Sequence, residues 1–494
     1  MPDTARAFLT ALHRAAIDGA APFARTSHAV RAWLQQPRDH LSTNAPIRLF
    51  AMGKAAPAMA AGAIYTLQSA SRDPAHCVVV CASKPTHREL GALESFPPNV
   101  DVHVGDHPIP GPASLDAGDA IERAVHNVQR GDVAMVLLSG GTTSLAAAPV
   151  AALSQAVGDV ERAQTRIANL ADTLLESGLA IHEMNAIRRR VLRWGAGRLA
   201  VALEARGAIA IPVFAISDVI GDDPAIIGSG PCSADPLDDA FFLALLDAHN
   251  VRGALERDMS SFLGLSGSGA PPAVPAESHH AFTLVQYTIV AQNADAVAAL
   301  AAEARRAAIT HVVVDPTALQ GEAMQLGHEL ARRAVAEAAL LPARESALVV
   351  FGGEPVVHLR NTYQHAFDAS DADDEEAVAE PSGDEPMAGG RMQVLALAAS
   401  LVLEEAVARG DHGARRVTLL AAGTDGRDGP TDAAGAIVDA VVPALARRAG
   451  RRPERDLITG RSWFPLNAAD ALLRTGPTGT NVMDVVAVLI GTTV

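Results

Sequence analysis

Cysteines, aromatic residues and long apolar runs are all scarce in this chain of 494 residues. The three cysteines are odd in number and show no metal-ligand spacing, which argues against a disulfide scaffold and a zinc site. No apolar run approaches the length of about 18 residues that a membrane helix needs. Residues 1–20 also lack the continuous apolar core of a secretory signal. The sequence therefore predicts a cytoplasmic protein without a membrane partner.

Basic residues are outnumbered by acidic ones, and much of the imbalance lies in one segment. The formal net charge is −16, and residues 368–386 hold nine acidic residues and no basic ones. This segment has no periodicity and is typical of a solvated, flexible loop. The rest of the chain is only mildly acidic, which argues against a nucleic-acid surface and says little about small anionic substrates.

Short apolar runs alternate with alanine-rich helical patterns, which predicts an α/β fold with a mostly parallel sheet. Because 494 residues exceed what one hydrophobic core usually supports, we expect two domains. Residues 264–278 are rich in Gly, Ser and Pro, so the predicted domains are residues 1–275 and 276–494. The predicted strands are residues 47–52, 77–82, 133–139, 211–217, 311–315, 347–352, 417–422 and 485–491, and the clearest helices are residues 159–178 and 294–308.

Three carboxylates stand on a glycine-rich turn, GTDGRDGPTD at residues 423–432, directly after a predicted buried strand. Acidic residues at the carboxyl end of such a strand face the crevice where open α/β sheets bind ligands. Asp425, Asp428 and Asp432 are therefore candidates for a metal site next to a phosphate. The alternative is that they cap a following helix at residues 433–442, and the turn alone does not decide between the two.

Two further loops follow predicted strands and offer groups that bind phosphate. Lys54 would lie at the start of a helix, although Arg48 and Ala55 stand where a Walker A loop needs Gly and Ser or Thr. Residues 139–144, SGGTTS, provide backbone N–H groups that can approach an oxyanion closely. Ser139 is not expected to be a hydrolase nucleophile, because the GxSxG motif is absent.

Other charged residues stand at the ends of predicted strands or in short loops. Asp218 follows the strand at residues 211–217, and Arg391 in a GGR loop could hold a carboxylate or phosphate in bidentate fashion. The densest basic patch is EMNAIRRRVLRWGAGR at residues 183–198. Consecutive arginines cannot share one helical face, so at most one or two of them point at a ligand. The alternative is a solvated, charged helix without a ligand.

Taken in order, nine motifs resemble those of the glycerate 2-kinase family, whose members are often labelled hydroxypyruvate reductase and whose C-terminal part is called the MOFRL domain. The resemblance spans nearly the whole chain. The motifs are GKAAPAM at residue 53, GDHPIP at 105, LLSGGTTSL at 137, EMNAIRR at 183, SDVIGDDPAIIGSGP at 217, FGGEPVV at 351, GGRMQVLALAAS at 389, GTDGRDGPTDAAGA at 423 and TGPTGTNVMD at 475.

The resemblance implies a Rossmann-like three-layer αβα N-terminal domain and a smaller α/β C-terminal domain of the MOFRL type, with the active site in the cleft between them. It implies ATP-dependent phosphorylation of D-glycerate at its 2-hydroxyl group, with Mg²⁺ or another divalent cation. Lys54 and Arg391 are implied as the anion-stabilising pair, and we assign the metal or base role to Asp218 or Asp425. The expected nucleotide-binding residues are Ser139, Gly140, Gly141, Ser144, Thr478, Gly479, Thr480 and Asn481, and the expected substrate-binding residues are Asn185, Arg188 and Glu354.

The chain departs from the family pattern at several positions. Gly195 stands where the family has a lysine, Met392 where it has an asparagine, and Gly111 where it has an aspartate. The SGG loop is also altered, with Thr143-Ser144-Leu145 at its end. If the missing lysine contacts phosphate, its loss removes a charge-assisted contact worth about 1.5–3 kcal/mol.

Three alternatives to a glycerate 2-kinase remain open on the sequence. A hydroxypyruvate reductase would need a dinucleotide site, yet no GxGxxG motif follows a strand. A degenerate homologue would bind nucleotide or a sugar acid without turnover, and a third alternative is a kinase for a longer sugar acid. The oligomeric state is also open, with a homodimer among the options.

Overall fold

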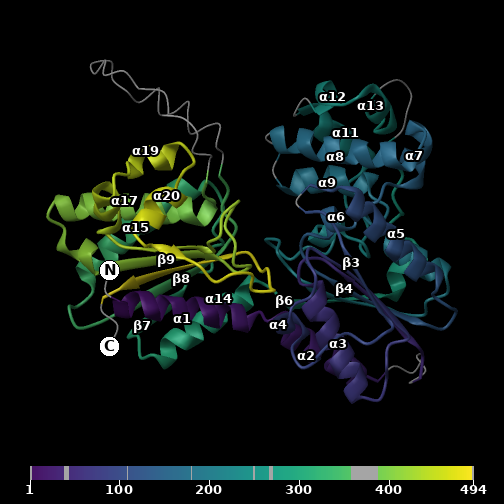
Figure 1. Cartoon of the computed structure of the whole chain (residues 1–494), viewed down its shortest axis with the longest axis horizontal. Helices are drawn as coiled ribbons and strands as arrows, with labels where there is room; N and C mark the ends of the chain where they lie inside the picture. The colour runs from purple at the N-terminus through teal and green to yellow at the C-terminus, as the bar shows by residue number, and fades with distance from the viewer. Residues whose placement is uncertain are drawn as a thin grey trace. The chain divides into compact units, whose positions relative to one another are not determined.

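The chain folds into two compact units in the computed structural model (Figure 1). The large unit comprises Ala21–Gln292, and the small unit comprises Met1–Ala20 together with Asn293–Val494. The predicted acidic loop at residues 368–386 lies outside the described part of the chain. The structure describes residues 3–37, 44–107, 109–177, 179, 181–248, 251–265, 271–357 and 388–491.

A six-stranded, fully parallel sheet forms the centre of the large unit. Its central strands are buried on both faces, which is why they read in the sequence as unbroken apolar runs. The strands are β1 (Ile47–Met52), β2 (His76–Cys81), β3 (Val100–Val104), β4 (Val133–Leu138), β5 (Ile211–Ile216) and β6 (Val285–Ala291).

The strand order of this sheet is β3-β2-β1-β4-β5-β6, so the winding direction reverses between β1 and β4. In doubly wound sheets of this order, ligands bind in the crevice outside the carboxyl ends of the strands at the reversal. The loops that start at Gly53 and Ser139 leave β1 and β4 at this point. The topology therefore selects these two loops before any chemistry is considered.

Helices cover this sheet and also build a separate helical lobe in the large unit. The lobe has its own apolar core, which includes Leu170, Ile187 and Phe242, and Figure 1 shows its helices α7 to α9 and α11 to α13 grouped together. The helices are α2 (Pro22–Gln35), α3 (Ala56–Ser69), α4 (His87–Leu90), α5 (Pro112–His126), α6 (Thr142–Leu145), α7 (Ala151–Val157), α8 (Val160–Glu176), α9 (Ile181–Val191), α10 (Arg198–Ala205), η1 (Ile227–Ser229), α11 (Asp239–Ala248), α12 (Val251–Ala254), α13 (Arg257–Phe262) and η2 (His280–Leu284).

The small unit contains a second six-stranded sheet, in the order β11-β10-β9-β12-β8-β7. This sheet is mixed: β7 and β8 are parallel, whereas β12 runs antiparallel to both β8 and β9. The expectation of a mostly parallel sheet therefore holds for the large unit and is wrong for the small one. The strands are β7 (His311–Val314), β8 (Ala347–Gly353), β9 (Val417–Gly423), β10 (Gly435–Val438), β11 (Leu472–Leu473) and β12 (Asp484–Ile490).

Helix α17 is the most deeply buried helix of the small unit, because its residues from Met392 to Leu403 form much of the apolar core. It packs against α15 and the sheet, while α1, from the start of the chain, packs against α14. The helices are α1 (Asp3–Gly19), α14 (Asn293–Arg306), α15 (Ala323–Leu340), α17 (Arg391–Ala408), η3 (His412–Arg416), α18 (Val442–Arg448), α19 (Pro453–Ile458) and α20 (Trp463–Ala468).

The structure confirms the α/β class and all eight predicted strands, to within one or two residues at their ends. The helix predicted at residues 433–442 is wrong: its β-branched centre forms β10, which pairs with β9. The chain also divides at different places from the predicted boundary near residue 275, because β6 pairs with β5 and extends the large unit to Gln292. Among the described helices, none is long and apolar enough to cross a membrane.

Candidate active site

The loops after β1 and β4 are bonded to each other at the reversal of the large unit's sheet. The amide of Lys54 donates to the carbonyl of Gly140 at 2.9 Å, and the amide of Ala55 donates to Ser139 Oγ at 3.0 Å. Gly53 has a φ of +120°, and a side chain there would overlap Ser139. Ser139 is therefore a buried link between two loops, which fixes the position of the lysine backbone.

Charged side chains surround the glycine pair Gly140 and Gly141. A Cβ atom at Gly140 would overlap the carboxylate of Asp218. A Cβ atom at Gly141 would lie 3.1 Å from Lys54 Cγ and 3.4 Å from His107 Cδ2. Position 141 also needs glycine because its φ is +86°. The structure thus brings three of the predicted site elements together and adds His107.

A small cavity lies beside the SGGTTS loop and includes Arg188 in its wall. Pro110, Thr143 and Ser144 line this cavity together with apolar residues of α8 and α9. Burial lowers the pKa of the Arg188 guanidinium, while Asp172 opposes that shift. Its Nε atom is buried without a hydrogen-bond partner. Arg188 is therefore the arginine of the basic patch best placed to receive an anion, and Asn185 lies one turn earlier on α9.

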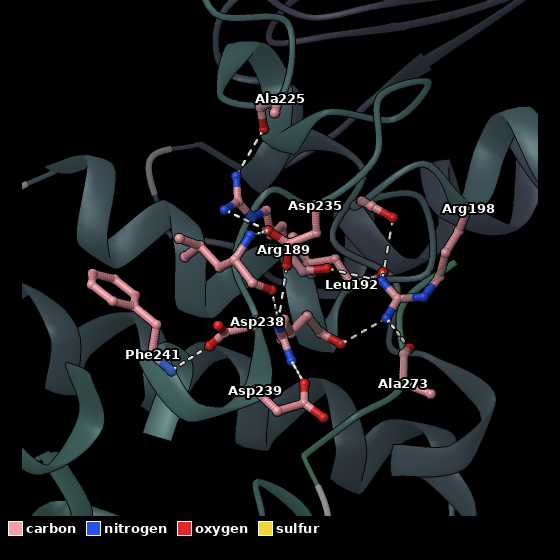
Figure 2. A network of polar contacts seen from close by, with 12 residues as sticks. Arg189, Leu192, Arg198, Ala225, Asp235, Asp238, Asp239, Phe241 and Ala273 are labelled. Carbon is pink, nitrogen blue, oxygen red and sulfur yellow. Dashed lines mark hydrogen bonds and ion pairs between the residues drawn. The ribbon is translucent and has the colours of Figure 1, made fainter. Parts of the chain in front are cut away.

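The neighbouring arginines of α9 are neither solvated nor directed at a ligand. Arg189 and Arg190 form ion pairs with the buried Asp235 at 2.7 and 3.1 Å, and Arg190 also pairs with Asp239 at 2.5 Å. Arg190 lies 4.6 Å from the ring centre of Phe242. Figure 2 shows Arg189, Asp235 and Asp239 as parts of one polar network. The predicted solvated helix is therefore wrong for these two residues, which instead tie α9 to the chain that enters α11.

Arg198 closes the same network from the start of α10 (Figure 2). Its guanidinium donates to the carbonyl groups of Arg189, Leu192, Gly195, Arg190 and Ala273. Burial lowers its pKa to about 10, so it stays charged at neutral pH. One arginine thereby satisfies the free carbonyls at the end of α9.

We expect Arg198→Leu to lower the free energy of unfolding by about 1–3 kcal/mol, because buried carbonyl groups would lose their donor. Urea denaturation of the full chain measures this loss. Arg206→Leu is the matched control: Arg206 makes an exposed hydrogen bond to one carbonyl, that of His126, and should cost less than about 0.5 kcal/mol. Equal unfolding midpoints for Arg198→Leu and the wild type would contradict the role of Arg198.

The departures from the family pattern have local explanations in the fold. A side chain at Gly195 would start only 2.8 Å from the carbonyl oxygen of Arg189, which is one of the groups that Arg198 binds. Gly111 leaves room for Asp106, which caps the start of α5 by accepting from the amide of Ala113 at 2.9 Å. Met392 is fully buried in the core of the small unit. None of these three positions carries a charge into a site.

Three loops of the small unit meet because β12 runs antiparallel to its neighbours. Asp484, the first residue of β12, is in register with Gly353 at the end of β8 and with Gly423 at the end of β9. The GGE, GTDG and NVMD segments therefore share one edge of the sheet. A parallel β12 would have placed Asp484 at the opposite edge.

Arg391 joins the carboxylates of these loops at the first residue of α17. Its guanidinium donates to Asp484 through Nε at 2.5 Å and Nη2 at 3.3 Å, and it lies 3.0 Å from Glu354. Burial alone would lower the pKa of Arg391, but Asp484 and Glu354 outweigh it and raise the pKa. Burial raises the pKa of Asp484 to about 6, although Arg391 opposes that shift. The result is a fixed cation within an excess of acidic groups.

Asp428 caps a helix, but it is α17 and not a following helix. Its carboxylate accepts from the amides of Met392 at 3.1 Å and Gln393 at 2.8 Å. Burial and the nearby Asp484 raise its pKa to about 7, against the two amides. Asp432 is exposed and accepts from Trp463 and Arg474 at 2.9 and 2.7 Å. Both aspartates are therefore structural.

The free energy of unfolding should fall between about pH 4 and pH 7 because of Asp428. The folded-state pKa of about 7 lies above the ordinary value of 3.8, so the folded chain holds a proton that the unfolded chain releases. This stabilisation is full below about pH 4 and is lost as the pH rises through 7. Asp428→Asn should flatten the dependence in chemical denaturation. Asp432→Asn should leave it unchanged in this range, because its partners Arg474 and Trp463 lower the pKa of Asp432. An unaltered slope in Asp428→Asn would contradict this assignment.

The loop of residues 475–481 is bonded to the Asp425 turn. The amide of Thr478 donates to the carbonyl of Asp425 at 3.2 Å, and its hydroxyl donates to the carbonyl of Thr424 at 2.6 Å. The Asp425 carboxylate accepts from the amide of Arg427 at 3.0 Å. Gly479 has a φ of +81°, which favours glycine at this turn. Thr478, Gly479, Thr480 and Asn481 thus form one wall next to Asp425 within the small unit.

Comparison with known proteins identifies the family. Residues 8–264 match a family described as a domain of unknown function, DUF4147, and residues 347–484 match the MOFRL family. The chain is 29% identical over 444 residues to a D-glycerate 2-kinase from Thermotoga maritima, with 90% of each chain covered. It is 30% identical over 399 residues to a glycerate 2-kinase from Pyrococcus horikoshii, covering 78% and 76% of the two chains. The chain belongs to the glycerate 2-kinase family.

A solved structure supports the same assignment at the level of the fold. The glycerate kinase of Thermotoga maritima matches with a TM-score of 0.71 and 26% identity, covering 99% of this chain and 100% of that one. A relative from Agrobacterium vitis carries the name "Putative hydroxypyruvate reductase". It is 31% identical to this chain, and the match covers 85% of this chain and 88% of the relative. The resemblance seen in the sequence motifs is thereby confirmed, together with the double name of the family.

Several residues that were expected in the site of this glycerate 2-kinase family member lie close together within each unit. Within the large unit, Lys54, Gly140, Gly141 and Asp218 lie together as expected, and within the small unit Arg391 joins Glu354. His107 and Asp484, which lie beside these residues, were not among the predicted site residues. The GDHPIP and NVMD motifs that contain them were visible in the sequence, but only the fold shows which residue of each motif faces the charged groups.

Proposed function

We propose that this chain transfers the terminal phosphoryl group of ATP to the 2-hydroxyl of D-glycerate. The observation that carries the proposal is the placement of Lys54, His107 and Asp218 around two glycines at the reversal of a doubly wound sheet. Membership of the glycerate 2-kinase family supplies the substrate class. Phosphoryl transfer needs mainly positioning and charge stabilisation, which suits a site of glycines, cations and carboxylates.

Each side chain has a proposed part in the reaction. Lys54 stabilises the charge on the transferring phosphoryl group. Asp218 accepts the proton of the substrate hydroxyl, and Arg188 with Asn185 binds the carboxylate of the acid. In the small unit, Arg391 stabilises phosphate charge, and the turns of residues 475–481 offer backbone N–H groups to phosphate oxygens. Ser139 supports Lys54 through the loop contact described above.

Mg²⁺ would be held with the nucleotide rather than in a cage of protein ligands. Among the described residues, no group of three or more His, Cys, Asp or Glu side chains is arranged to hold a metal ion. Mg²⁺ commonly takes one or two carboxylates plus substrate phosphates, so Asp425 or Asp218 fits as a single ligand. When bound, the ion would neutralise charge on the phosphates.

The free, buried cysteines Cys77, Cys81 and Cys232 support a reducing, cytoplasmic setting.

The test is ADP release from Mg-ATP with a panel of D-glycerate, L-glycerate and four-carbon aldonates. The proposal predicts the highest kcat/KM with D-glycerate. A preference for an aldonate would redirect the proposal to a longer acid, and no turnover with any acid would favour a binding protein. Oxidation of NADH or NADPH on addition of hydroxypyruvate would favour the reductase, for which no GxGxxG motif follows β1.

A further inference from the structure

Helix α1 belongs to the small unit although the whole large unit intervenes between the two in the sequence. Polar contacts join it to the rest of the small unit at three points, the last of which is one residue past the end of the helix. Arg6 donates to the carbonyls of Asp470 at 2.5 Å and Leu472 at 2.9 Å. His13 lies 3.0 Å from the carbonyl oxygen of Gly423, and the carbonyl of Ala20 accepts from Thr480 Oγ1 at 3.0 Å. The second and third contacts reach the two polar loops of the candidate site.

His13 is a buried donor in this helix. Its side chain is 1% exposed, and burial lowers its pKa to about 4 against the hydrogen bond to Gly423. The imidazole is therefore neutral at physiological pH. A carbonyl oxygen can only accept, so Nε2 carries the proton and donates it to Gly423. Without this donor, the Gly423 oxygen would lose a buried hydrogen bond.

Two carboxylates lie close to the α-carbon of Gly423. It is the last residue of β9 and is in register with Asp484. A Cβ atom built on it would lie 3.2 Å from Asp425 Oδ1 and 3.3 Å from Asp484 Oδ1. The peptide group that accepts the hydrogen bond from His13 therefore lies next to the carboxylates of Asp425 and Asp484. A rotation of this peptide would move Asp425, which is two residues further along the chain.

We propose that His13 is a positioning residue, which fixes the Gly423 peptide and through it the carboxylate of Asp425. The inference rests on the proposed function, because Asp425 matters only if the small unit takes part in phosphoryl transfer. The N-terminal helix would then be part of the catalytic apparatus, although none of its side chains touches a substrate. Small displacements of a positioned group can lower a rate about 100-fold.

Three variants of the full chain separate positioning from stability. His13→Leu removes the donor and keeps the apolar volume. His13→Gln restores an N–H at a similar distance. Leu12→Ala is the matched control, since Leu12 is fully buried in the same helix and makes no side-chain hydrogen bond. Should His13→Leu fail to fold, His13→Asn replaces it, because its shorter amide does not reach Gly423.

Two readouts test the inference. We expect kcat in His13→Leu to fall about 10- to 100-fold with little change in KM, His13→Gln to recover most of the loss, and Leu12→Ala to keep the wild-type kcat. Hydrogen exchange of the Arg427 amide, which donates to Asp425, should be faster in His13→Leu and restored in His13→Gln. Wild-type kcat in His13→Leu would overturn the proposal. Unchanged exchange would overturn it even if the wild type phosphorylates no acid, an outcome that would separately refute the proposed function.

Discussion

Lys54→Ala is expected to lower kcat for glycerate phosphorylation by about 100-fold or more, while the free energy of unfolding stays within about 0.5 kcal/mol of the wild type. The lysine backbone is fixed by its hydrogen bond to Gly140, and the side chain passes beside Gly141. Truncation leaves those backbone contacts intact and removes the cation. Steady-state ADP release and urea denaturation measure the two quantities.

The chain offers a matched control for this variant, because it contains only two lysines. Lys84 is exposed and lies beyond the end of β2. Lys84→Ala should keep the wild-type kcat. Turnover at the wild-type rate in Lys54→Ala, or an equal loss in both variants, would remove Lys54 from the proposed site.

Arg391→Ala should lower both activity and stability. The substitution leaves Asp484, which is 4% exposed, without its cation, and it places Glu354, Asp428 and Asp484 near one another uncompensated. Breaking a fully buried pair costs about 3–5 kcal/mol. Because the Arg391 side chain is 34% exposed, water reduces the loss, and we expect about 2–3 kcal/mol. The expected fall in kcat is about 100-fold.

Arg409→Ala, at the residue that follows the last residue of the same helix, controls for the loss of an arginine. Arg409 makes an exposed ion pair with Glu405 at 2.6 Å, and its removal should cost less than about 0.5 kcal/mol. Arg391→Lys should keep part of the stability, since a lysine retains the charge but cannot bind Asp484 in bidentate fashion. An Arg391→Ala protein as stable as Arg409→Ala would contradict the ion-pair network.

The sequence predicted the strands well because most are buried on both faces and appear as continuous apolar runs. β10 was interpreted as part of a helix. A strand of four residues between polar turns is too short for its apolar pattern to distinguish a strand from a helix. β3 was also missed, because it is an edge strand with exposed residues such as Asp101. The βα repeats of the large unit predict a parallel sheet. The residues of β12 contain no local pattern that predicts its antiparallel direction.

The antiparallel direction of β12 explains why Asp484 was not predicted as part of the candidate site. Asp484 begins β12, so a parallel sheet would separate it from Asp425 by the length of a strand. The antiparallel register brings both carboxylates over Gly423. His13 was not predicted either, because its contact also depends on the tertiary fold. A single histidine on an apolar helix does not indicate that the helix packs against a loop some four hundred residues later.

If this chain transfers a phosphoryl group to the 2-hydroxyl of D-glycerate, the product carries its phosphate on the 2-oxygen. Proton-coupled phosphorus NMR of a reaction with Mg-ATP and D-glycerate distinguishes the two isomers. Phosphorus on the 2-oxygen couples to one proton and gives a doublet, whereas phosphorus on the 3-oxygen couples to two and gives a triplet. We predict the doublet from the wild type, and its formation at least about 100-fold more slowly in Lys54→Ala. A triplet, or no phosphorylated acid from the wild type, would show that this chain is not a glycerate 2-kinase.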